Sequence, residues 1–314
     1  MRVATETFVN SLINQVNTLS SQMDTLENQV TTGLSVQAPS DNPAAMQTTL
    51  NDLNGQATQQ QYSSNISTLQ SQANSIYSVL QQLQTITSQA GTIATEAGSA
   101  TNSQTDLNDY ASQVTGLIQQ ALQLVNAKDP ATGQYLFGGT ASVTQPFTAT
   151  TDANGNVTGV TYQGNSSVNQ VQIGSGTTIS VAVPGVNNTG SGQQGLITDS
   201  RTGADLFNHL IALQNDLASG NTAAITGTDT QNLQNDENNI TYQVANNGNV
   251  QTRLETASSF ANNQSTSLTQ GITNASGADV VQTMVQLNQA QNAYEAALET
   301  TSRIMQVSIV DFLA

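Results

Sequence analysis

The chain has 314 residues, of which 36% are hydrophobic and only 8% are charged, and its formal net charge at pH 7 is −16. Since about a quarter of the residues of an ordinary globular protein are charged, the polar surface here must come chiefly from Gln, Asn, Ser and Thr. The five Lys and Arg residues provide no basic patch for nucleic acid or an anionic membrane, and the absence of Cys excludes disulfides, thiolate metal sites and cysteine nucleophiles.

Residues 3–34 are predicted to form a helix with a narrow apolar seam. Its apolar residues recur at alternating steps of four and three, the period of a helix that packs on a partner helix. The seam consists of Phe8, Leu12, Val16, Leu19, Met23, Leu26 and Val30. We expect the helix to end near Gly33, because glycine tolerates the left-handed conformation of a C-terminal cap.

A short segment of turn-forming residues follows, made of Pro39, Ser40, Asp41, Asn42 and Pro43. Pro39 disfavours helical geometry in the residue before it. Asn42 is suited to cap the next helix, with Pro43 at the first helical position, where a missing N–H costs nothing. The segment is therefore predicted to be a defined joint between two helices.

Two helices are predicted after this joint, over residues 44–97 and 107–127. Each carries an apolar face, and a small polar loop at 98–104 separates them, so an antiparallel helical hairpin is the simplest arrangement. Thr105 or Asp106 is the expected cap of the second helix.

Residues 129–200 differ in character, with frequent Gly and short runs of β-branched residues. Asn154-Gly155 precedes the first run and is a signal for a type I′ turn. The runs predicted to be strands are 157–162, 168–173 and 179–183. We therefore predict a small β domain inserted between helices.

Helical periodicity returns at 203–218 and, after a polar loop at 220–227, continues to about residue 273. Gly277 separates that helix from a last one, from Val280 to Phe312, which has the same four-and-three seam as the first helix. Its seam consists of Val280, Met284, Leu287, Tyr294, Leu298, Thr301, Met305, Ser308 and Phe312. The matching seams predict an antiparallel pair of terminal helices in a mainly α fold, an elongated helical bundle with a β insert in mid-chain.

The titratable residues of the sequence do not predict a catalytic or metal site. His209 is the only His, lies one position off an apolar helix face, and is predicted to be a surface or interface residue. The adjacent Asp236 and Glu237 point about 100° apart on a helix, so they are predicted to lie on a solvated face. We expect no cofactor and no enzymatic activity.

One loop resembles the start of a calcium-binding loop, Asp152-Ala153-Asn154-Gly155-Asn156. Position six, however, is Val157 where such a loop needs Gly, and position twelve is Gln163 where it needs Glu. A hairpin turn is therefore the favoured interpretation of this loop.

Three stretches are specific enough to compare with a known family. The first is Thr31-Thr32-Gly33 with the joint that ends at Ala44, the second is Asp129-Pro130-Ala131-Thr132-Gly133-Gln134-Tyr135-Leu136-Phe137-Gly138-Gly139, and the third is the C-terminal segment 290–313. Together they resemble the hook-associated protein 3 family of flagellar hook–filament junction proteins, within the flagellin superfamily. The second stretch is the most specific, because many flagellins lack it.

The resemblance implies three domains. Residues 1–40 with 276–314 form a terminal coiled-coil domain of an inner tube, 41–130 with 200–275 form a helical rod domain, and 131–199 form the inserted β domain. The entry to the β domain is Tyr135, Phe137, Gly138 and Gly139, and the joint is Pro39 to Pro43. The residues expected at the assembly interface are Phe8, Leu12, Val16, Leu19, Met23, Leu26, Val30, Met284, Leu287, Tyr294, Leu298, Met305 and Phe312.

The function implied by the resemblance is that of a structural adaptor between hook and filament, outside the bacterial cell. Subunits are expected to form a ring with one another, between the other hook–filament junction protein and the first flagellin. Export is expected through the flagellar type III pathway, with a cytoplasmic chaperone on the C-terminal region. The N-terminal segment lacks the apolar run of a Sec-type signal peptide, and no apolar run reaches the roughly 18 residues of a membrane span.

The seams of the terminal helices contain Thr, Ser and Gln among their apolar residues, so each helix buries little apolar surface on its own. We therefore predict coupled folding and assembly, in which these helices gain order when they stack on neighbouring subunits. Two alternatives stay open. A filament flagellin is distinguished from a junction protein by its copy number in sheared flagella. A glycan-binding module in the β insert is distinguished by its ligands, although no clustered aromatic platform is present in the sequence.

Overall fold

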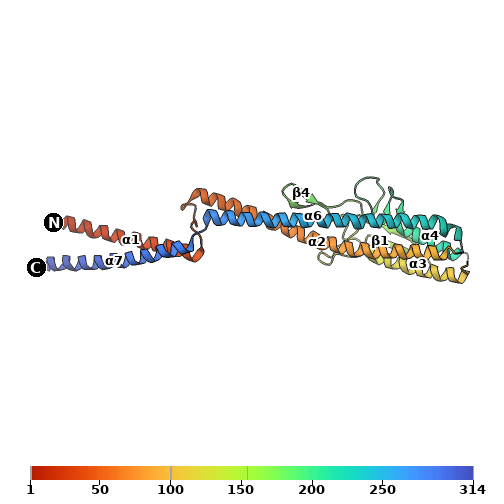
Figure 1. The fold of residues 1–314 in the computed structure, drawn as a ribbon, viewed down its shortest axis with the longest axis horizontal. Helices are drawn as coiled ribbons and strands as arrows, with labels where there is room; N and C mark the ends of the chain where they lie inside the picture. The colour runs from red at the N-terminus through yellow and green to blue at the C-terminus, as the bar shows by residue number, and fades with distance from the viewer. Residues whose placement is uncertain (1, 100, 154, 314) are drawn as a thin grey trace. The chain divides into compact units, whose positions relative to one another are not determined.

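The computed structural model describes residues 2–99, 101–153 and 155–313, with side chains described for residue 7 and between residues 10 and 303. Helices make up most of this chain and short strands occupy its middle (Figure 1), which confirms the predicted mainly α fold with a β insert. The chain divides into two compact units, Met1–Gln59 with Asn263–Ala314 as unit 1 and Gln60–Asn262 as unit 2. The three-domain division stays a prediction.

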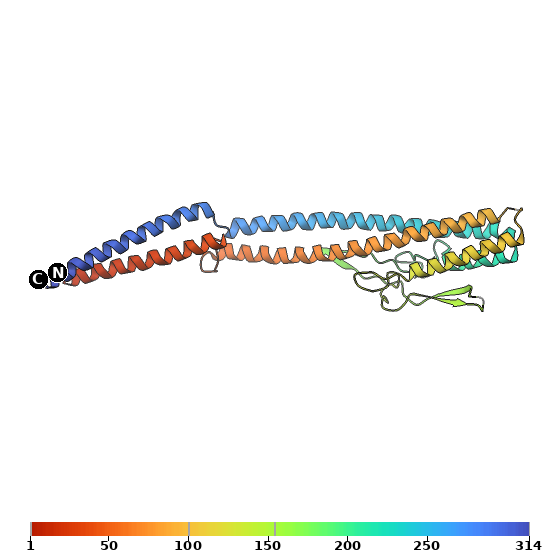
Figure 2. The ribbon, with the colours of Figure 1, turned by 90° about the horizontal axis from the view of Figure 1, so that it is seen from below.

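Unit 1 is built around the two ends of the chain. Helix α1 (Arg2–Thr32) lies alongside α7 (Val280–Leu313) in both ribbon views (Figures 1 and 2), and the two run antiparallel. The unit also contains the first turns of α2 (Pro43–Ala97) and the last turns of α6 (Thr230–Ser276). The predicted antiparallel pairing of terminal helices is confirmed.

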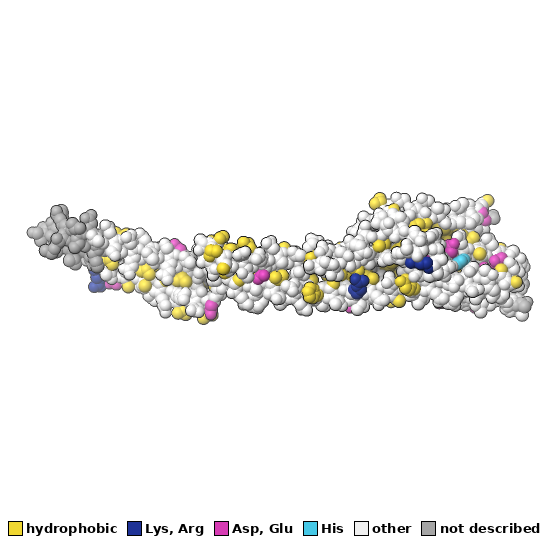
Figure 3. All heavy atoms as spheres, turned by 90° about the horizontal axis from the view of Figure 1, so that it is seen from above, with side chains coloured by type: hydrophobic (Ala, Val, Ile, Leu, Met, Phe, Trp, Pro, Cys, Tyr) yellow, Lys and Arg dark blue, Asp and Glu magenta, His cyan; other side chains and the backbone are white. Residues whose placement is uncertain are grey.

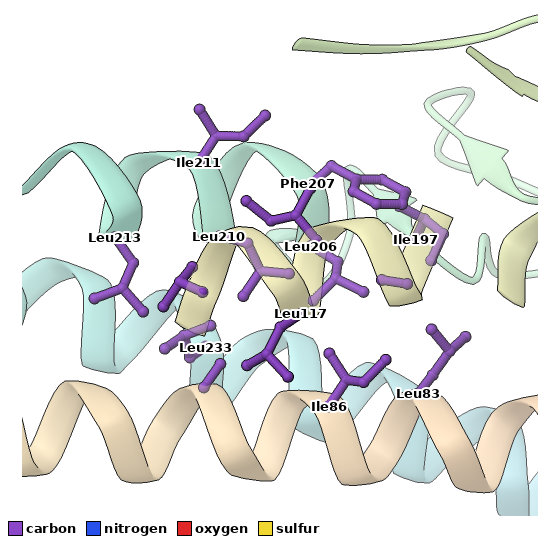
Figure 4. Packing of buried hydrophobic residues seen from close by; sticks show 14 of the residues in the cluster. Leu83, Ile86, Leu117, Ile197, Leu206, Phe207, Leu210, Ile211, Leu213 and Leu233 are labelled. Carbon is purple, nitrogen blue, oxygen red and sulfur yellow. The ribbon is translucent and has the colours of Figure 1, made fainter. Parts of the chain in front are cut away.

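Unit 2 contains the rest of α2 and α6, together with α3 (Gln104–Val125) and α4 (Leu206–Ser219). Figure 4 shows the core between these helices, where side chains from all four meet. The largest buried aliphatic side chains of this core include Leu80, Leu83, Ile118, Leu206, Leu210 and Leu213. The predicted leucine face of α4 is therefore the face that contacts α3.

The cap of α3 differs from the expectation. Ser103, and not Thr105 or Asp106, is the N-cap residue. Its hydroxyl accepts from the backbone N–H of Asp106 at 3.3 Å, and the Asp106 carboxylate accepts from the backbone N–H of Ser103 at 2.9 Å. This reciprocal capping box satisfies two helix-end donors at once, which neither residue proposed from the sequence does alone.

The insert consists of three small sheets. Strands β1 (Phe147–Thr151) and β2 (Val157–Tyr162) pair antiparallel, as do β3 (Val171–Gly174) and β4 (Thr177–Ile179). The third sheet has the order β5 (Val186–Asn187), β6 (Thr198–Asp199) and β7 (Ala204–Asp205). Phe147, Val157 and Ile197 belong to the same core as the helices, so the insert buries its apolar face against the bundle.

The predicted strand at 157–162 is confirmed, and the other two runs form shorter strands than expected. In the last run only Ile179 lies in a strand, while Val181 and Val183 are buried outside any ladder. The hairpin between β1 and β2 closes through Asp152 and Asn156, and Gly155 has φ +85°. The predicted type I′ turn includes Asn154, which lies outside the described residues.

The start of α6 also differs from the expectation of a loop over 220–227. Gly220 caps α4 with φ 72°, and a one-turn helix α5 (Thr222–Ala224) begins directly after it. A π-helical turn η1 (Ile225–Asp229) then connects α5 to α6. The polar sequence is helical because Ile225 is fully buried and Asn221 caps the turn, its side chain accepting from the N–H of Ala224.

The surface is predominantly uncharged. Figure 3 shows few Lys, Arg, Asp or Glu side chains on the face in view, as the 8% charged composition requires. In the described part of the chain, no helix is both long and apolar enough to cross a membrane.

Candidate assembly site

The described side chains of the predicted α1 seam are buried or half-buried, and α1 contacts α7. Leu26 is 7% exposed, and the other described seam side chains are half-buried. These are Leu12, Val16, Leu19, Met23 and Val30. The side chain of Phe8 lies outside the described residues, as do those of Met305 and Phe312 on α7.

The seam of α7 has a different register from the predicted one. Leu287, Tyr294 and Thr301 are half-buried at every seventh position, as the prediction places them. Four residues before Leu287 and before Tyr294, the chain buries the small residues Thr283 and Ala290, each 6% exposed. The spacing is still four and three, but small side chains occupy every second position, which allows the two helices to approach closely.

The larger apolar residues beside that seam are uncovered in the single chain. Met284 is 50% exposed and Leu298 is 44% exposed, next to the side of α7 that contacts α1. Val281, Val285 and Val280 are exposed as well. We call Met284 and Leu298 the free edge of α7. That all these residues contact other subunits stays a prediction.

The joint between α1 and α2 is tied to the turn between α6 and α7. Gly33 ends α1 with φ +69°, and its carbonyl accepts from the N–H of Ala278 at 2.9 Å. Ser35 donates its backbone N–H to the carbonyl of Ser276 at 2.7 Å, and its hydroxyl contacts the carbonyls of Ser276 and Gly277. Hydrogen bonds therefore join the α1–α2 connection to the α6–α7 connection of unit 1.

Asp41 organises the joint internally. Its carboxylate accepts from the N–H of Ala38 at 2.8 Å and from that of Gln37 at 3.0 Å. These two backbone donors hold the pKa of Asp41 below its usual value. Asn42 then accepts from the N–H of Ala45 at 3.1 Å, so it caps α2 as predicted, with Pro43 as the first helical residue.

The entry to the insert is held by backbone hydrogen bonds around a buried aromatic side chain. Phe137 is fully buried, and its carbonyl accepts from the N–H of Gly185 and from the hydroxyl of Tyr162, both at 3.0 Å. Gly139 has φ +65°, and a Cβ there would collide with the carbonyl of Asn165. Only glycine fits this position, which explains one glycine of the Tyr-Leu-Phe-Gly-Gly stretch.

Tyr135, another predicted entry residue, packs against the only lysine. The ammonium of Lys128 lies 4.7 Å from the centre of the Tyr135 ring, and the two residues form an isolated antiparallel bridge. The N–H of Tyr135 donates to the carbonyl of Ser142 at 2.8 Å. The entry residues are thus brought together, and their contacts are internal to unit 2.

The expectation of a solvated face is wrong for Asp236, whereas His209, predicted at the surface or at an interface, is half-buried against it. Asp236 is 1% exposed and accepts from the N–H of Asp205 at 2.8 Å. Nδ1 of His209 lies 2.8 Å from its second carboxylate oxygen. Burial lowers the pKa of His209, but the hydrogen bond and charge of Asp236, with Asp205 and Asp229, raise it above the usual value overall.

Amide side chains on one face of α6 are functional residues that the sequence did not reveal. Asn239 donates to the carbonyls of Gly195 and Leu196 at 3.0 and 2.7 Å, and Gln243 donates to that of Gln194 at 2.9 Å. One turn further, Asn247 donates to the carbonyl of Ala73 in α2 at 3.2 Å. The four-residue spacing was a readable signal, but amides are too common in this chain to single them out.

The described side chains include no group of three or more His, Asp or Glu residues that could hold a metal ion together. The features that stand out are instead the terminal helix pair, the braced joint and the insert entry. All three are suited to packing.

Two family descriptions match the chain. Residues 3–142 match the bacterial flagellin N-terminal helical region, and residues 230–313 match the bacterial flagellin C-terminal helical region. Together they cover well over half of the chain, including α1 and α7. At the level of sequence, none of the curated proteins matches the chain.

Several solved structures share the fold. A protein assigned as a flagellar hook-associated protein from Vibrio parahaemolyticus superposes with a TM-score of 0.64 at 19% identity, over 76% of this chain and 100% of that one. FlgL from Xanthomonas campestris has a TM-score of 0.57 at 17% identity, over 70% and 99%. Flagellar hook-associated protein-3 from Legionella pneumophila has a TM-score of 0.57 at 15% identity, over 70% and 97%. At these identities the likeness establishes the fold alone.

Proposed function

We propose that this chain, which belongs to the bacterial flagellin family, is the structural subunit that joins the hook to the filament of a bacterial flagellum. The observation that carries the proposal is the pairing of α1 with α7, since both helices lie in the matched flagellin regions. The junction role, as opposed to that of bulk flagellin, is supported by the likeness to hook-associated proteins over nearly their whole length.

Assembly uses the apolar surface that unit 1 leaves uncovered. The free edge of α7 exposes Met284 and Leu298, and α2 exposes Leu50 and Leu53 in the same unit. Burying about 100 Å² of such surface per side chain in a neighbour stabilises the contact by roughly 2–3 kcal/mol. The formal net charge of −16 makes identical subunits repel one another, and physiological salt screens this repulsion beyond roughly 8 Å.

The subunit acts outside the cell, after export through the flagellar type III pathway. Copies of the chain form a ring that contacts the other hook–filament junction protein on one side and the first flagellin on the other. A cytoplasmic chaperone holds the C-terminal region before export. Residues 1–40 with 276–314 line the inner tube, 41–130 with 200–275 form the rod, and 131–199 face outward. The terminal helices gain order as neighbouring copies stack on them.

Immunogold electron microscopy of sheared flagella tests the proposal, with the antibody raised against residues 60–262. We expect label at one point per filament, where the hook ends. Label along the whole filament would instead identify the filament flagellin, and label away from the flagellum would contradict both roles.

A further inference from the structure

A cavity of about 240 Å³ lies in unit 2, where the chain that leaves the insert meets α6. One wall consists of residues 192–194, between β5 and β6, with Arg201 between β6 and β7. The other wall is a face of α6 that carries Tyr242, Gln243 and Asn246. Sites for drug-sized ligands measure about 300–1,000 Å³, so this cavity suits a smaller molecule.

The loop wall of the cavity is held in place by hydrogen bonds within unit 2. The buried amide of Asn187 donates to the carbonyls of Ser191, at 2.7 Å, and of Gln193. From the opposite wall, the amide of Gln243 donates to the carbonyl of Gln194 at 2.9 Å. Because the walls are already fixed, a ligand that enters the cavity orders few additional groups.

The cavity has no unbalanced charge. Nε and Nη2 of Arg201 donate to the two carboxylate oxygens of Asp199 at 2.9 and 2.6 Å, and Nη1 donates to the carbonyl of Gly192 at 3.0 Å. Asp199 is fully buried, and Arg201 is the only charged residue among the described ones that line the cavity. An anion would have to compete with Asp199 for the guanidinium, and a cation would find no carboxylate, so the lining favours a neutral ligand.

The polar groups of the lining are chiefly amides. Gln193, Gln194, Gln243 and Asn246 each have a carbonyl acceptor and an NH2 donor. Oε1 of Gln193 is buried, and no donor in the described part of the chain reaches it. Since the last torsion of a glutamine side chain is broad, a small rotation of the amide presents this oxygen to the cavity. A hydroxyl group, which both donates and accepts, is a suitable partner for such amides.

Tyr242 adds a flat apolar surface to these polar groups. Its side chain is 50% exposed, whereas that of the adjacent Gln243 is buried. An aromatic ring beside neutral amides matches a ligand that has an apolar face and a polar edge. We propose that the cavity binds one pyranose ring of a neutral sugar, with the C–H face of the sugar on Tyr242 and its hydroxyls on Gln193 and Asn246.

The proposed sugar site goes beyond the junction role. None of the residues that line the cavity belongs to the predicted assembly interface, which lies on α1 and α7. The single chain should therefore bind the sugar without neighbouring subunits, and a failure to bind would not affect the junction role.

Nitrogen-15 NMR of the full chain tests the site. D-glucose, D-galactose, D-mannose and N-acetyl-D-glucosamine are titrated separately, each to saturation or to its solubility limit. We expect at least one of them to shift the side-chain amide signals of Gln193 and Asn246 saturably, while the exposed Asn292 of α7 does not respond. Each signal is identified by its loss in the corresponding alanine variant. The absence of a saturable shift with all of these sugars would overturn the proposal, as would saturable shifts with sodium sulfate alone.

Variants of two exposed aromatic residues on α6 test the role of the ring. Tyr242→Ala should raise the Kd for the sugar by about tenfold, because the stacked face is lost. Tyr242→Phe keeps the ring and should bind nearly as tightly as the wild type. Phe260→Ala is the matched control, since Phe260 is 66% exposed on the same helix and lies outside the cavity. Equal Kd values for Tyr242→Ala and Phe260→Ala, with circular dichroism showing both folded, would contradict the proposed site.

Discussion

Buried amides hold unit 2 together where other proteins use charges. Asn239, Gln243 and Asn247 lie at four-residue intervals along α6 and donate to carbonyls at the exit of the insert and in α2. The carbonyls of Gln194, Gly195 and Leu196 lie outside regular secondary structure, so the amides of Asn239 and Gln243 satisfy backbone groups that would otherwise be buried without a donor. This arrangement places the insert against α6 without any ion pair.

Asn239→Ala should lower the free energy of unfolding by about 1–3 kcal/mol, because the Leu196 carbonyl loses its donor and the Gly195 carbonyl keeps only the longer bond from Gln243, at 3.4 Å. Chemical denaturation of the variant and the wild type measures this difference. Asn238→Ala is the matched control, since Asn238 is exposed on the same helix turn. Equal losses of stability in the two variants would show that helix propensity, and not the hydrogen bonds of the Asn239 amide, determines the effect.

Gly139→Ala should destabilise unit 2 by roughly 2 kcal/mol or more. The backbone at φ +65° is strained for any other residue, and the added methyl group meets the Asn165 carbonyl. Gly159→Ala in β2 is the control, because no atom lies within 4 Å of its added Cβ. If thermal unfolding finds Gly139→Ala as stable as the control, the entry geometry described here is incorrect.

At the scale of elements, α4 and α6 are joined by the His209–Asp236 pair. His209→Leu leaves the Asp236 carboxylate buried without its partner and should cost roughly 2–3 kcal/mol at pH 6, whereas His209→Gln keeps a donor and should cost less. The raised pKa of His209 means that its contribution is fully present below 6.5 and is lost as the pH rises through the folded value.

Equilibrium unfolding of these two variants across pH 6–9 measures both effects. The wild type should lose stability relative to His209→Gln as the pH rises. A wild type that keeps a constant advantage across this range would contradict a charged His209 in the folded chain.

The free edge of α7 predicts an effect on assembly without an effect on folding. Leu298 is 44% exposed in the single chain, so Leu298→Asp should leave the circular dichroism and Tm of the monomer unchanged. In a ring the same residue would bury a charge, and incorporation into flagella should fail. Asn292→Asp, on another side of the same helix, should incorporate normally. Normal filaments in cells that carry Leu298→Asp would refute the predicted interface.

The sequence predicts the positions of the helices better than it predicts which side of each helix is buried. The described members of the predicted α1 seam, which are large and apolar, are buried or half-buried, and Asn42 caps α2 as its position before Pro43 predicts. The seam of α7 is ambiguous because the inward positions are the small Thr283 and Ala290, while the larger Met284 lies beside them. A period of seven fits both registers, and the tertiary contact with α1 selects one.

Buried polar positions were beyond prediction for a related reason. The sequence predicts a surface position for Asp236, because a carboxylate is seldom buried without a specific partner. That partner is His209, which lies on another helix and is not visible in the local sequence. The π-turn at Ile225–Asp229 was missed because polar residues and glycine normally indicate a loop. In both cases a contact distant in sequence reverses the local preference.

At the scale of the whole molecule, the two chain ends depend on each other. Each terminal helix has a seam too narrow to be stable alone, and together they form unit 1 with its braced joint. The low charge of the chain suits a subunit that packs closely against identical and related neighbours. The flagellin family membership and the free edge of α7 both indicate a protein whose function is assembly.

Deletion of the gene in its own bacterium tests the central claim most directly. Flagellin is measured by immunoblotting of the culture medium and of the sheared cell fraction, and a plasmid copy of the gene serves as the control for rescue. We expect flagellin to accumulate as monomers in the medium, while hooks without filaments remain on the cells. Flagellin absent from both fractions would identify this chain as the filament subunit, and intact filaments with normal swimming would contradict the junction role.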